Sequence, residues 1–324
     1  MPQTSADSAL QIAKKLRKWL ICIYTQIFLW YYVRAQNAAR RDMKKGQVKM
    51  KGIFKKIAIA AMAAAMLLSV GCGSSSSSKS DASSSKDDSL QKVMDAGKLR
   101  LGLDATFKPM GYTDENDKIV GFDIDLAEEV CKRMGIKLEP VGVDWDTKEQ
   151  DLNADKIDCI WNGLSVSDER KKQMLMSEPY MNNKMVFMVN KDSGIKSKDD
   201  LKGKKVAVQN GSTAQDTLKG ADIYSDLTVS ELGTNVEAIQ QLELKMVDAV
   251  FLDSVVADYE ITSTGKPYET LSDTLYEEQY AVGFKLGANE LCKKIEDTLK
   301  EMKKDGKTEE IAKKWFGSDV TTIK

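Results

Sequence analysis

The sequence predicts an α/β protein whose folded body has two lobes, and two observations lead to this fold class. From Leu90 onward, short apolar runs alternate with amphipathic stretches at helical spacing, as expected when strands alternate with helices. The helix–strand order of residues 148–163 then returns at residues 235–253. Two similar α/β halves favour two lobes around a shared cleft, and small ligands bind at the carboxyl ends of strands in such folds.

Length and composition narrow the function classes. With 324 residues the chain has room for about two domains, and it contains no histidine. The absence of histidine removes Ser-His-Asp and Cys-His catalysis and the commonest transition-metal ligand, so we expect no metal and no cofactor. Residues 1–72 carry 13 Lys and Arg against two Asp, which leaves a net charge of −12 on residues 73–324. An acidic body argues against nucleic acid as a partner.

The N-terminal 88 residues predict targeting segments and no packed structure. Residues 50–72 have a lysine-rich start, an uncharged apolar run and a Gly-Cys end, the order of a secretory signal. They resemble a bacterial lipoprotein signal, which implies lipidation at Cys72; the alternative is a plain signal peptide. Residues 73–88 are rich in Ser, Lys and Asp and predict a flexible tether. Residues 1–49 are interpreted as a translated upstream extension, although their apolar stretch 19–33 could also form a short membrane helix.

The elements of the first half follow from the apolar pattern. Residues 99–105 predict a buried strand, and residues 122–134 predict a helix with one apolar face that Gly135 ends. Residues 137–143 predict the next strand. Residues 148–163 predict a helix that runs into a strand ending at Gly163.

A polar segment after that strand is the sharpest local signal. It runs from Asn162 to Arg170, and Ser167 is a good N-cap for a helix that starts at Ser167 or Asp168. A helix N-terminus attracts anions, and Arg170 can add a bidentate grip on a carboxylate. An ordinary capped helix with a surface arginine is the alternative.

The second half repeats these elements. Residues 204–218 predict a strand, a Gly-Ser-Thr turn and a helix, and residues 235–253 predict a helix followed by a strand. From residue 288 a helix pair follows, separated by Gly306, with Trp315 and Phe316 expected in the core. Cys131, Cys159 and Cys292 occupy apolar positions and no CxxC motif, so we expect all three to be free.

Several motifs in a fixed order carry a family resemblance. They are GFDIDLAEEV (121–130), DWD (144–146), GLSVSDERKK (163–172), SEPYMNNKMVFMV (177–189), KKVAVQNGST (204–213) and DAVFLD (248–253). From about Leu90 to Phe316 the chain resembles the polar amino-acid-binding proteins of bacterial ABC importers, periplasmic-binding-protein family 3.

The resemblance implies a two-lobed periplasmic-binding-protein-like fold (type II) with two hinge strands. The first lobe would comprise residues 89–187 and 279–324, and the second lobe residues 188–278. The hinges would lie near Val186–Asn190 and Tyr276–Tyr280. It also implies a monomeric, lipid-anchored protein on the outer face of the cell membrane that hands an amino acid to an ABC permease and ATPase.

The resemblance assigns the ends of the amino acid to specific residues. Arg170 and Ser165 would bind the α-carboxylate, and Ser212 and Thr213 would cap it from the second lobe. The α-ammonium would be held by the carbonyl of Gly163 and the carboxylate of Asp253. Binding both signs of a buried zwitterion avoids costly unpaired charges.

The side-chain subsite is less defined. The resemblance makes Phe107 and Trp145 aromatic walls, with core packing as the alternative, and leaves Trp161 between core and rim. It places Asp104 at the tip of the ligand side chain and Gln209 opposite, where some relatives carry lysine. An acid without that lysine favours a cationic tip, whereas Gln209 could also serve an amide or the second zwitterion of cystine.

Two rival functions remain open at this stage. An enzyme on the same fold, such as a prephenate or arogenate dehydratase, would need a general acid that faces the ligand, and Asp104 is the candidate. An amino-acid-sensing lipoprotein that feeds no importer is the other. The intact amino-acid clamp favours a binding protein without a catalytic residue.

Overall fold

The computed structural model describes residues 87–273 and 275–324. The predicted extension (1–49), the signal peptide with Cys72 (50–72) and all but the last two residues of the tether lie outside the described residues. None of the helices in the described part combines the length and the apolar character that a membrane crossing requires.

Strands form the centre of the described body. They are β1 (Lys98–Leu103), β2 (Thr106–Phe107), β3 (Gly111–Thr113), β4 (Ile119–Val120), β5 (Lys137–Gly142), β6 (Cys159–Ser165), β7 (Leu175–Met176), β8 (Met181–Asn190), β9 (Lys205–Gln209), β10 (Thr228–Leu232), β11 (Ala249–Asp253), β12 (Tyr268–Thr270) and β13 (Tyr276–Phe284). In the described residues, a ten-stranded sheet follows the order β10-β9-β11-β8-β13-β6-β1-β5, with β12 beside β8 and β7 beside β13. A separate small sheet has the order β2-β3-β4.

Helices flank the sheet. They are α3 (Ser89–Ala96), α4 (Phe122–Met134), α5 (Lys148–Asn153), α6 (Asp168–Gln173), α7 (Thr213–Gly220), α8 (Asn235–Glu243), α9 (Ser254–Thr264), α10 (Asn289–Lys304) and α11 (Lys307–Phe316), with 3-10 helices η1 (Lys198–Leu201) and η2 (Asp222–Asp226). The predicted helix 122–134 is confirmed, and Gly135 caps it with a left-handed backbone.

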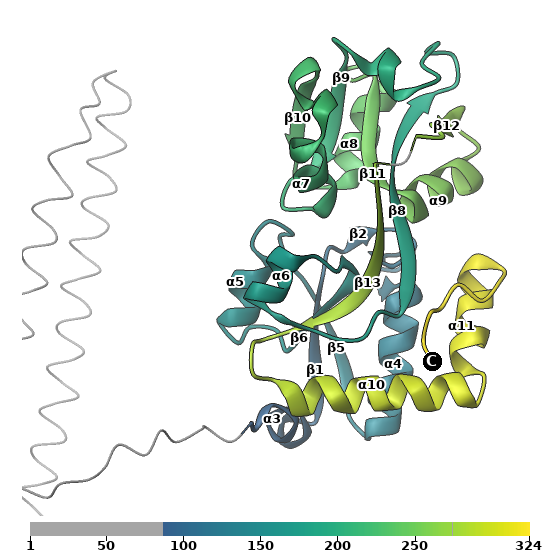
Figure 1. The fold of residues 1–324 in the computed structure, drawn as a ribbon. Helices are drawn as coiled ribbons and strands as arrows, with labels where there is room; N and C mark the ends of the chain where they lie inside the picture. Colours follow the sequence, from purple (N-terminus) through teal and green to yellow (C-terminus); the bar gives the residue numbers. More distant parts are fainter. Residues whose placement is uncertain (1–86, 274) are drawn as a thin grey trace, which may run out of the picture. The chain divides into compact units, whose positions relative to one another are not determined.

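The sheet divides into two lobes, which confirms the predicted fold class. We call β1, β5 and β6 with α3–α6, α10 and α11 the first lobe, and β9–β12 with α7–α9 the second lobe (Figure 1). In the first lobe β1 runs parallel to β5 and β6, and in the second β9 runs parallel to β10 and β11. Strands β1, β6, β9 and β11 are almost entirely buried, which explains their continuous apolar runs.

Two long antiparallel strands, β8 and β13, connect the lobes (Figure 1). They pair with each other over residues 181–185 and 276–280. Beyond this stretch β8 pairs with β11 of the second lobe, and β13 pairs with β6 of the first. The second crossing stretch coincides with the expected residues 276–280, but the first precedes the expected 186–190, because residues 185–189 already belong to the ladder with β11.

One strand end differs from the prediction. Strand β6 continues past Gly163 to Ser165, because Leu164 and Ser165 pair with Ala281 and Tyr280 of β13. This partner is more than a hundred residues away in the sequence, so the local pattern does not reveal it. Helix α6 begins at Asp168 with Ser167 as its N-cap, as predicted.

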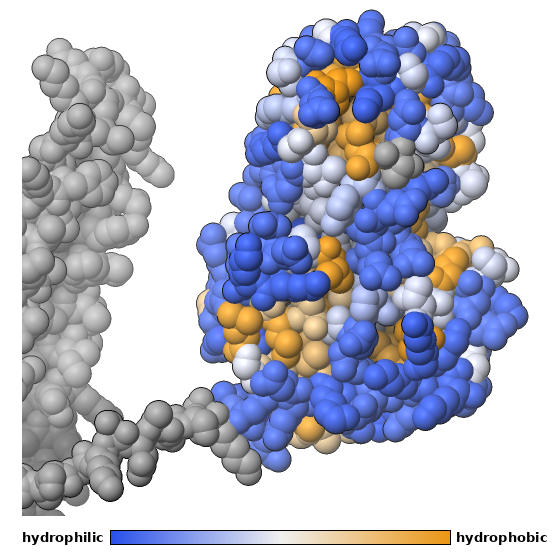
Figure 2. Space-filling model, viewed as in Figure 1, coloured by the Kyte–Doolittle hydropathy of each residue, from blue (hydrophilic) through white to orange (hydrophobic). Residues whose placement is uncertain are grey.

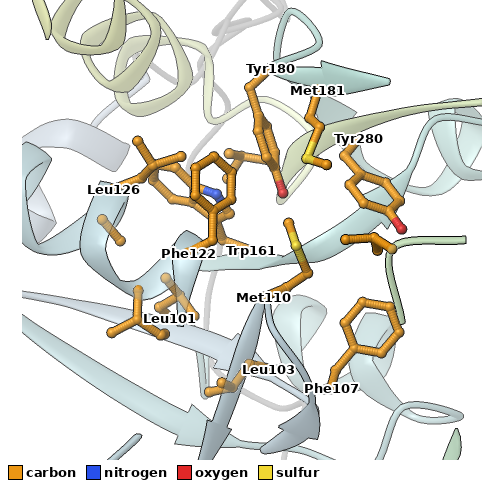
Figure 3. Packing of buried hydrophobic residues seen from close by; sticks show 14 of the residues in the cluster. Leu101, Leu103, Phe107, Met110, Phe122, Leu126, Trp161, Tyr180, Met181 and Tyr280 are labelled. Atoms are coloured by element: carbon orange, nitrogen blue, oxygen red, sulfur yellow. The ribbon is translucent and has the colours of Figure 1, made fainter. Parts of the chain in front are cut away.

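The largest apolar cluster contains residues of both lobes. In Figure 3, Phe122, Leu126, Trp161 and Tyr180 converge in the first-lobe part of this cluster. Trp161 is fully buried there, which resolves its assignment as core. The rings of Trp161 and Tyr180 lie 6.1 Å apart.

The C-terminal helices form the predicted pair and pack on the first lobe, where Trp315 and Phe316 are half-buried. Helix α10 buries a stripe of apolar residues that begins at Leu291 and ends at Met302, and its solvent side is hydrophilic in Figure 2. Phe316 of α11 packs edge to face on Phe122 at 5.1 Å, and Trp315 packs against the same cluster. The three cysteines of the body are buried and free, which confirms that prediction.

Candidate functional site at the contact between the lobes

All ten residues predicted to bind ligand are buried, although most of them are polar or charged. They come from both lobes and lie on loops, on strands near their ends and in the first turns of α6 and α7. Folding does not bury charged side chains unless their cost is offset by partners or by function. The partners of each residue therefore indicate which ones have remaining binding capacity.

Arg170 has such capacity. The N-cap Ser167 accepts a hydrogen bond from the Arg170 backbone N–H, which fixes the start of α6. The side chain turns inward, is 8% exposed, and donates through Nη1 to the carbonyl oxygen of Ser165 at 2.9 Å. In the part of the chain that the structure describes, arginine ion pairs form at Arg100 and Arg133 and none forms at Arg170. A buried guanidinium without a carboxylate partner is suited to bind an anion from outside.

The electrostatic surroundings of Arg170 are acidic at longer range. Burial lowers the pKa of Arg170, and the carboxyls of Glu149, Glu278, Asp216 and Asp253 oppose that shift. Arginine keeps its proton even under strong perturbation, so this group stays a cation. The site thus holds a fixed positive charge surrounded by acids that do not contact it.

Two of these acids, Asp253 and Glu278, form a buried pair. The Asn183 side-chain amide donates from Nδ2 to Asp253 Oδ1 at 2.9 Å and to Glu278 Oε1 at 2.7 Å. The Tyr280 hydroxyl donates to Asp253 Oδ1 at 2.5 Å. Burial raises the pKa of both carboxyls, that of Glu278 to about 8. The nearby negative charge of Asp253 adds to the upward shift of the Glu278 pKa.

Gly163 lies beside two aromatic rings. A Cβ at this position would stand 2.8 Å from Phe107 and 3.2 Å from Tyr280, and its φ is +56°, so only glycine fits. Its N–H donates to Asp123 Oδ2 at 2.7 Å, behind the site. Phe107 and Tyr280 mark one edge of the apolar cluster in Figure 3. Phe107 therefore lies next to Gly163 while it also packs in the core.

Asp104 and Gln209 meet across the lobes. Gln209 Nε2 donates to Asp104 Oδ2 at 2.7 Å and to the carbonyl oxygen of Gly233, and Gln209 Oε1 accepts from Asn235. Asp104 Oδ1 accepts from the backbone N–H and the hydroxyl of Thr106. Among the described residues Asp104 has no lysine partner, and the amide expected opposite it, Gln209, contacts it directly.

Lys148 makes the second contact between the lobes. Its ammonium is 2% exposed and donates to the carbonyl oxygens of Trp145 at 2.9 Å and Gly211 at 3.0 Å. It also lies 3.0 Å from Glu149 Oε1 and 4.7 Å from the centre of the Trp145 ring. Burial and the nearby Arg170 lower the pKa of Lys148 to about 8. Trp145 packs in a first-lobe apolar cluster, and its carbonyl oxygen accepts from Lys148.

Ser212 and Thr213 begin helix α7. Ser212 Oγ accepts from the Gln215 backbone N–H and donates to the carbonyl oxygen of Gln209. Thr213 occupies the first position of the helix. Both side chains are buried beside Gly211, which Lys148 binds.

The geometry groups the predicted residues into three contact sets. Arg170 contacts Ser165, Gly163 contacts Phe107 and Tyr280, and Asp104 contacts Gln209. Sequence reasoning missed four members: Lys148, Asn183, Glu278 and Tyr280. Strand alternation could have identified the last three, because Asn183 shares the buried face of β8 with Met181 and Met185, and Glu278 shares that of β13 with Tyr280. Lys148 carries no comparable signal.

Two α/β lobes linked by crossing strands, with charged residues buried where they meet, define a two-lobed ligand-binding protein. The chain belongs to the bacterial extracellular solute-binding proteins, family 3, which it matches over residues 99–318.

Two curated relatives illustrate the similarity. The L-cystine-binding protein TcyJ of Escherichia coli (strain K12) is 30% identical over 240 residues, which cover 72% of this chain and 87% of TcyJ. The arginine-binding extracellular protein ArtP of Bacillus subtilis (strain 168) is 32% identical over 221 residues, covering 68% of this chain and 86% of ArtP.

Two solved structures are similar as well. An ABC uptake transporter substrate binding protein from Streptococcus pneumoniae with bound histidine is 34% identical, with a TM-score of 0.71 over 74% of this chain and 99% of that one. The ancestral amino acid-binding protein AncCDT-1, a precursor of cyclohexadienyl dehydratase, is 35% identical, with a TM-score of 0.66 over 70% of this chain and 99% of its own.

Proposed function

We propose that this protein captures a polar amino acid, cationic, glutamine or cystine-like, between its lobes and delivers it to an ABC permease and ATPase. The observation that carries the proposal is the buried guanidinium of Arg170, which has no carboxylate partner in the described chain and lies near the buried acids Asp253 and Glu278. An amino-acid zwitterion supplies the missing carboxylate and an ammonium for the acids. Relatives with the names of cystine- and arginine-binding proteins support this class of ligand.

In this proposal each end of the ligand meets a separate contact set. The α-carboxylate binds Arg170 and Ser165 and is capped by Ser212 and Thr213. The α-ammonium binds Asp253 and the carbonyl of Gly163. Binding both ends at once requires the lobes to be closed, so the ligand favours the closed state in proportion to its contacts there.

The side chain of the ligand extends toward the remaining residues. Phe107 and Trp145 border its stem, and the Asp104–Gln209 pair meets its tip. An acid paired with an amide accepts donors from a guanidinium, an ammonium or an amide, which is why we keep the three ligand types together. An acidic side chain would face Asp104 and be repelled.

We further propose that the protein works as a monomer on the outer face of the cell membrane. Cys72 would carry the lipid, and residues 73–88 would tether the folded body. This part of the proposal rests on the signal-like order of residues 50–72. Mass spectrometry of the membrane-extracted protein tests it, with Cys72→Ser expected to abolish the lipid and release the protein.

A thermal-shift panel with the twenty amino acids, ornithine and cystine tests the ligand proposal. The protein is first unfolded and refolded to remove any carried ligand. A ligand at about 100 times its Kd adds about 2.7 kcal/mol of stability, so a true ligand shifts Tm clearly. We expect arginine, lysine, glutamine or cystine to shift Tm more than glutamate does. Equal shifts for all compounds would refute the placement of Asp104, and no shift for any would refute the function.

Because the chain is similar to a precursor of a dehydratase, dehydratase activity should be tested directly. A dehydratase needs a protonated acid that faces its substrate, and burial raises the pKa of Glu278 to about 8. Incubation with prephenate, followed by absorbance of the aromatic product, decides this. We expect no turnover. Prephenate carries no ammonium group, so it would leave Asp253 of the amino-acid clamp without a partner.

A further inference from the structure

We propose that Glu278 and Asp253 share one proton in the ligand-free site, and that the ammonium of the ligand takes the place of this proton, so that binding releases it. This inference deepens the proposed function and rests on it. It assigns Glu278, which lies on the crossing strand β13, to the ammonium subsite.

The first step of the argument is the way Asn183 holds the two carboxyls together. Ser254 Oγ donates to Asn183 Oδ1 at 3.1 Å, which orients the amide so that Nδ2 faces the acids. Nδ2 then donates to both Asp253 Oδ1 and Glu278 Oε1. One amide that binds two carboxyl oxygens at 2.9 and 2.7 Å requires those carboxyls to be close neighbours.

The second step is the free oxygen of Glu278. This side chain is 6% exposed, and its Oε2 is buried without a hydrogen-bond partner. A buried acceptor without a donor is costly, whereas a protonated carboxyl can donate to a neighbouring carboxylate. A hydrogen bond from Glu278 to Asp253 satisfies the oxygen and removes one of two adjacent negative charges.

The third step concerns the other groups that face Glu278. They are Asp253 of β11, Arg170 of α6 and the neutral side chains of Ser165, Asn183 and Tyr280. Arg170 alone among them is cationic, and it makes no ion pair in the described chain. Lys148 is engaged by Glu149 and two carbonyl oxygens. The surroundings therefore do not neutralise two carboxylates until a further cation arrives.

The ligand brings that cation together with an anion. Its carboxylate neutralises Arg170, and its ammonium donates to Asp253 and Glu278, which is then ionised. The O–H bond of Glu278 breaks, its electron pair stays on the carboxylate, the proton goes to the buffer, and no other bond changes. A 2-hydroxy acid has no charge to replace the proton and should bind poorly.

Calorimetry on the whole protein tests the inference with L-arginine and L-glutamine as probes. At pH 6.5, titrations in phosphate and in Bis-Tris buffer, which differ in ionisation enthalpy, report the protons released. We expect close to one proton per ligand for the unaltered chain and for Glu277→Gln, an exposed neighbour on the same strand. For Glu278→Gln we expect close to none. Argininic acid, the 2-hydroxy analogue of arginine, should bind at least 100-fold more weakly than arginine.

The outcomes separate this inference from the proposed function. Heat of binding with no proton release, or equal release from Glu278→Gln, overturns the inference and leaves the function standing. No heat with any amino acid overturns both. Should Glu278→Gln not fold, the Kd of the unaltered chain between pH 5.5 and 7.5 decides: about tenfold tighter binding per pH unit supports the displaced proton, and a flat profile refutes it.

Discussion

The two lobes contribute different charges to their contact. At this contact the first lobe buries two cations, Arg170 and Lys148, and the acid Asp104, with a second acid, Asp123, buried behind them. The second lobe buries Asp253 beside neutral groups such as Gln209, and the crossing strand adds Glu278. The buried cations thus belong to the first lobe, and most of the neutral hydrogen-bonding groups belong to the second.

This difference separates contacts that hold the lobes directly from those that need a ligand. Lys148 binds the carbonyl of Gly211, and Gln209 binds Asp104, so these partners are satisfied across the lobes. Arg170 and Asp253 make no ion pair with each other, although their charges are opposite. We infer that direct contacts set how easily the lobes close, whereas Arg170 and Asp253 set how strongly a ligand keeps them closed.

Loss of the first-lobe cation should have the largest effect. In Arg170→Met the ligand carboxylate would be buried without its partner, which costs about 3–5 kcal/mol in comparable pairs. Calorimetry should therefore detect no binding in the micromolar range, with Tm of the ligand-free protein nearly unchanged. Lys171→Ala, an exposed neighbour on the same helix, should bind normally. Micromolar binding by Arg170→Met would contradict the carboxylate assignment.

Removal of the second-lobe charge should cost less. Asp253→Asn keeps an acceptor for Tyr280 and Asn183, and Glu278 remains to supply a negative charge to the ammonium. We expect an affinity loss of about 3 kcal/mol, the low end for a broken buried pair. Asp192→Asn, which changes an exposed ion pair with Lys245, is the matched control. An unchanged Kd for Asp253→Asn would place the ammonium elsewhere.

Closure itself can be blocked without touching a charge. A Cβ on Gly211 would stand 2.7 Å from the Asp146 backbone across the lobes, and Gly211 has φ +67°. In Gly211→Ala we expect about 2 kcal/mol weaker binding, because the lobes cannot approach fully. Gly203→Ala has φ +74° but no heavy atom within 4 Å, so it carries the same backbone strain without the clash. Equal affinities of the two variants would mean that closure does not bring these loops together.

The direct bridge from Lys148 should have a smaller effect on affinity. Lys148→Met removes the hydrogen bond to Gly211 but also removes the cost of burying an ammonium, so the net loss should be about 1–2 kcal/mol. Stopped-flow kinetics should show it as faster ligand release, since the bridge exists only when the lobes touch. Lys156→Met, on an exposed ion pair of the same lobe, is the control. A change confined to the association rate would argue against a bridge.

How much the sequence reveals differs between the elements and the site. Helix 122–134 and its glycine cap follow from local apolar spacing, and the Ser167 cap places Arg170 in the first turn of α6. The cap alone leaves a surface arginine open, and only the fold shows the side chain turned inward to the carbonyl oxygen of Ser165. The length of β6 does not follow, because Leu164 and Ser165 pair with a strand over a hundred residues away. Lys148 is the clearest omission. Its burial depends on a carbonyl of the other lobe, and no local pattern encodes a contact between lobes.

The acid pair shows a second kind of limit. Alternation along β13 is enough to place Glu278 on the buried side, but its chemistry depends on Asn183 and Asp253 from two other strands. The contact between Asp104 and Gln209 has the same limit: the sequence places an acid opposite an amide, and only the folded arrangement shows that the two are hydrogen-bonded. Residue types predict which groups can bind a charge, and only the fold decides which are already occupied.

The smallest effect concerns a carboxyl that lies behind the first-lobe part of the site. Asp123 is 0% exposed, its Oδ2 accepts from Gly163, and its Oδ1 has no partner. Burial raises the pKa of Asp123 from 3.8 to about 7. A carboxyl whose pKa is higher in the folded than in the unfolded state contributes its full stability to the fold at pH values below the unfolded pKa. This contribution is lost as the pH rises toward 7, by at most about 1.4 kcal/mol per pH unit.

Urea unfolding of the ligand-free protein at pH 5, 6 and 7 tests this shift. The free energy of unfolding should fall with rising pH in the unaltered chain, and less steeply in Asp123→Asn, which stays neutral throughout. Glu278→Gln should reduce the slope as well, because the pKa of Glu278 is raised in the same direction. Ligand at saturation should remove only the Glu278 part, since Asp123 contacts the backbone of Gly163 and belongs to none of the proposed ligand contacts. A slope that is the same with and without ligand would separate Glu278 from the ammonium subsite and return it to the core.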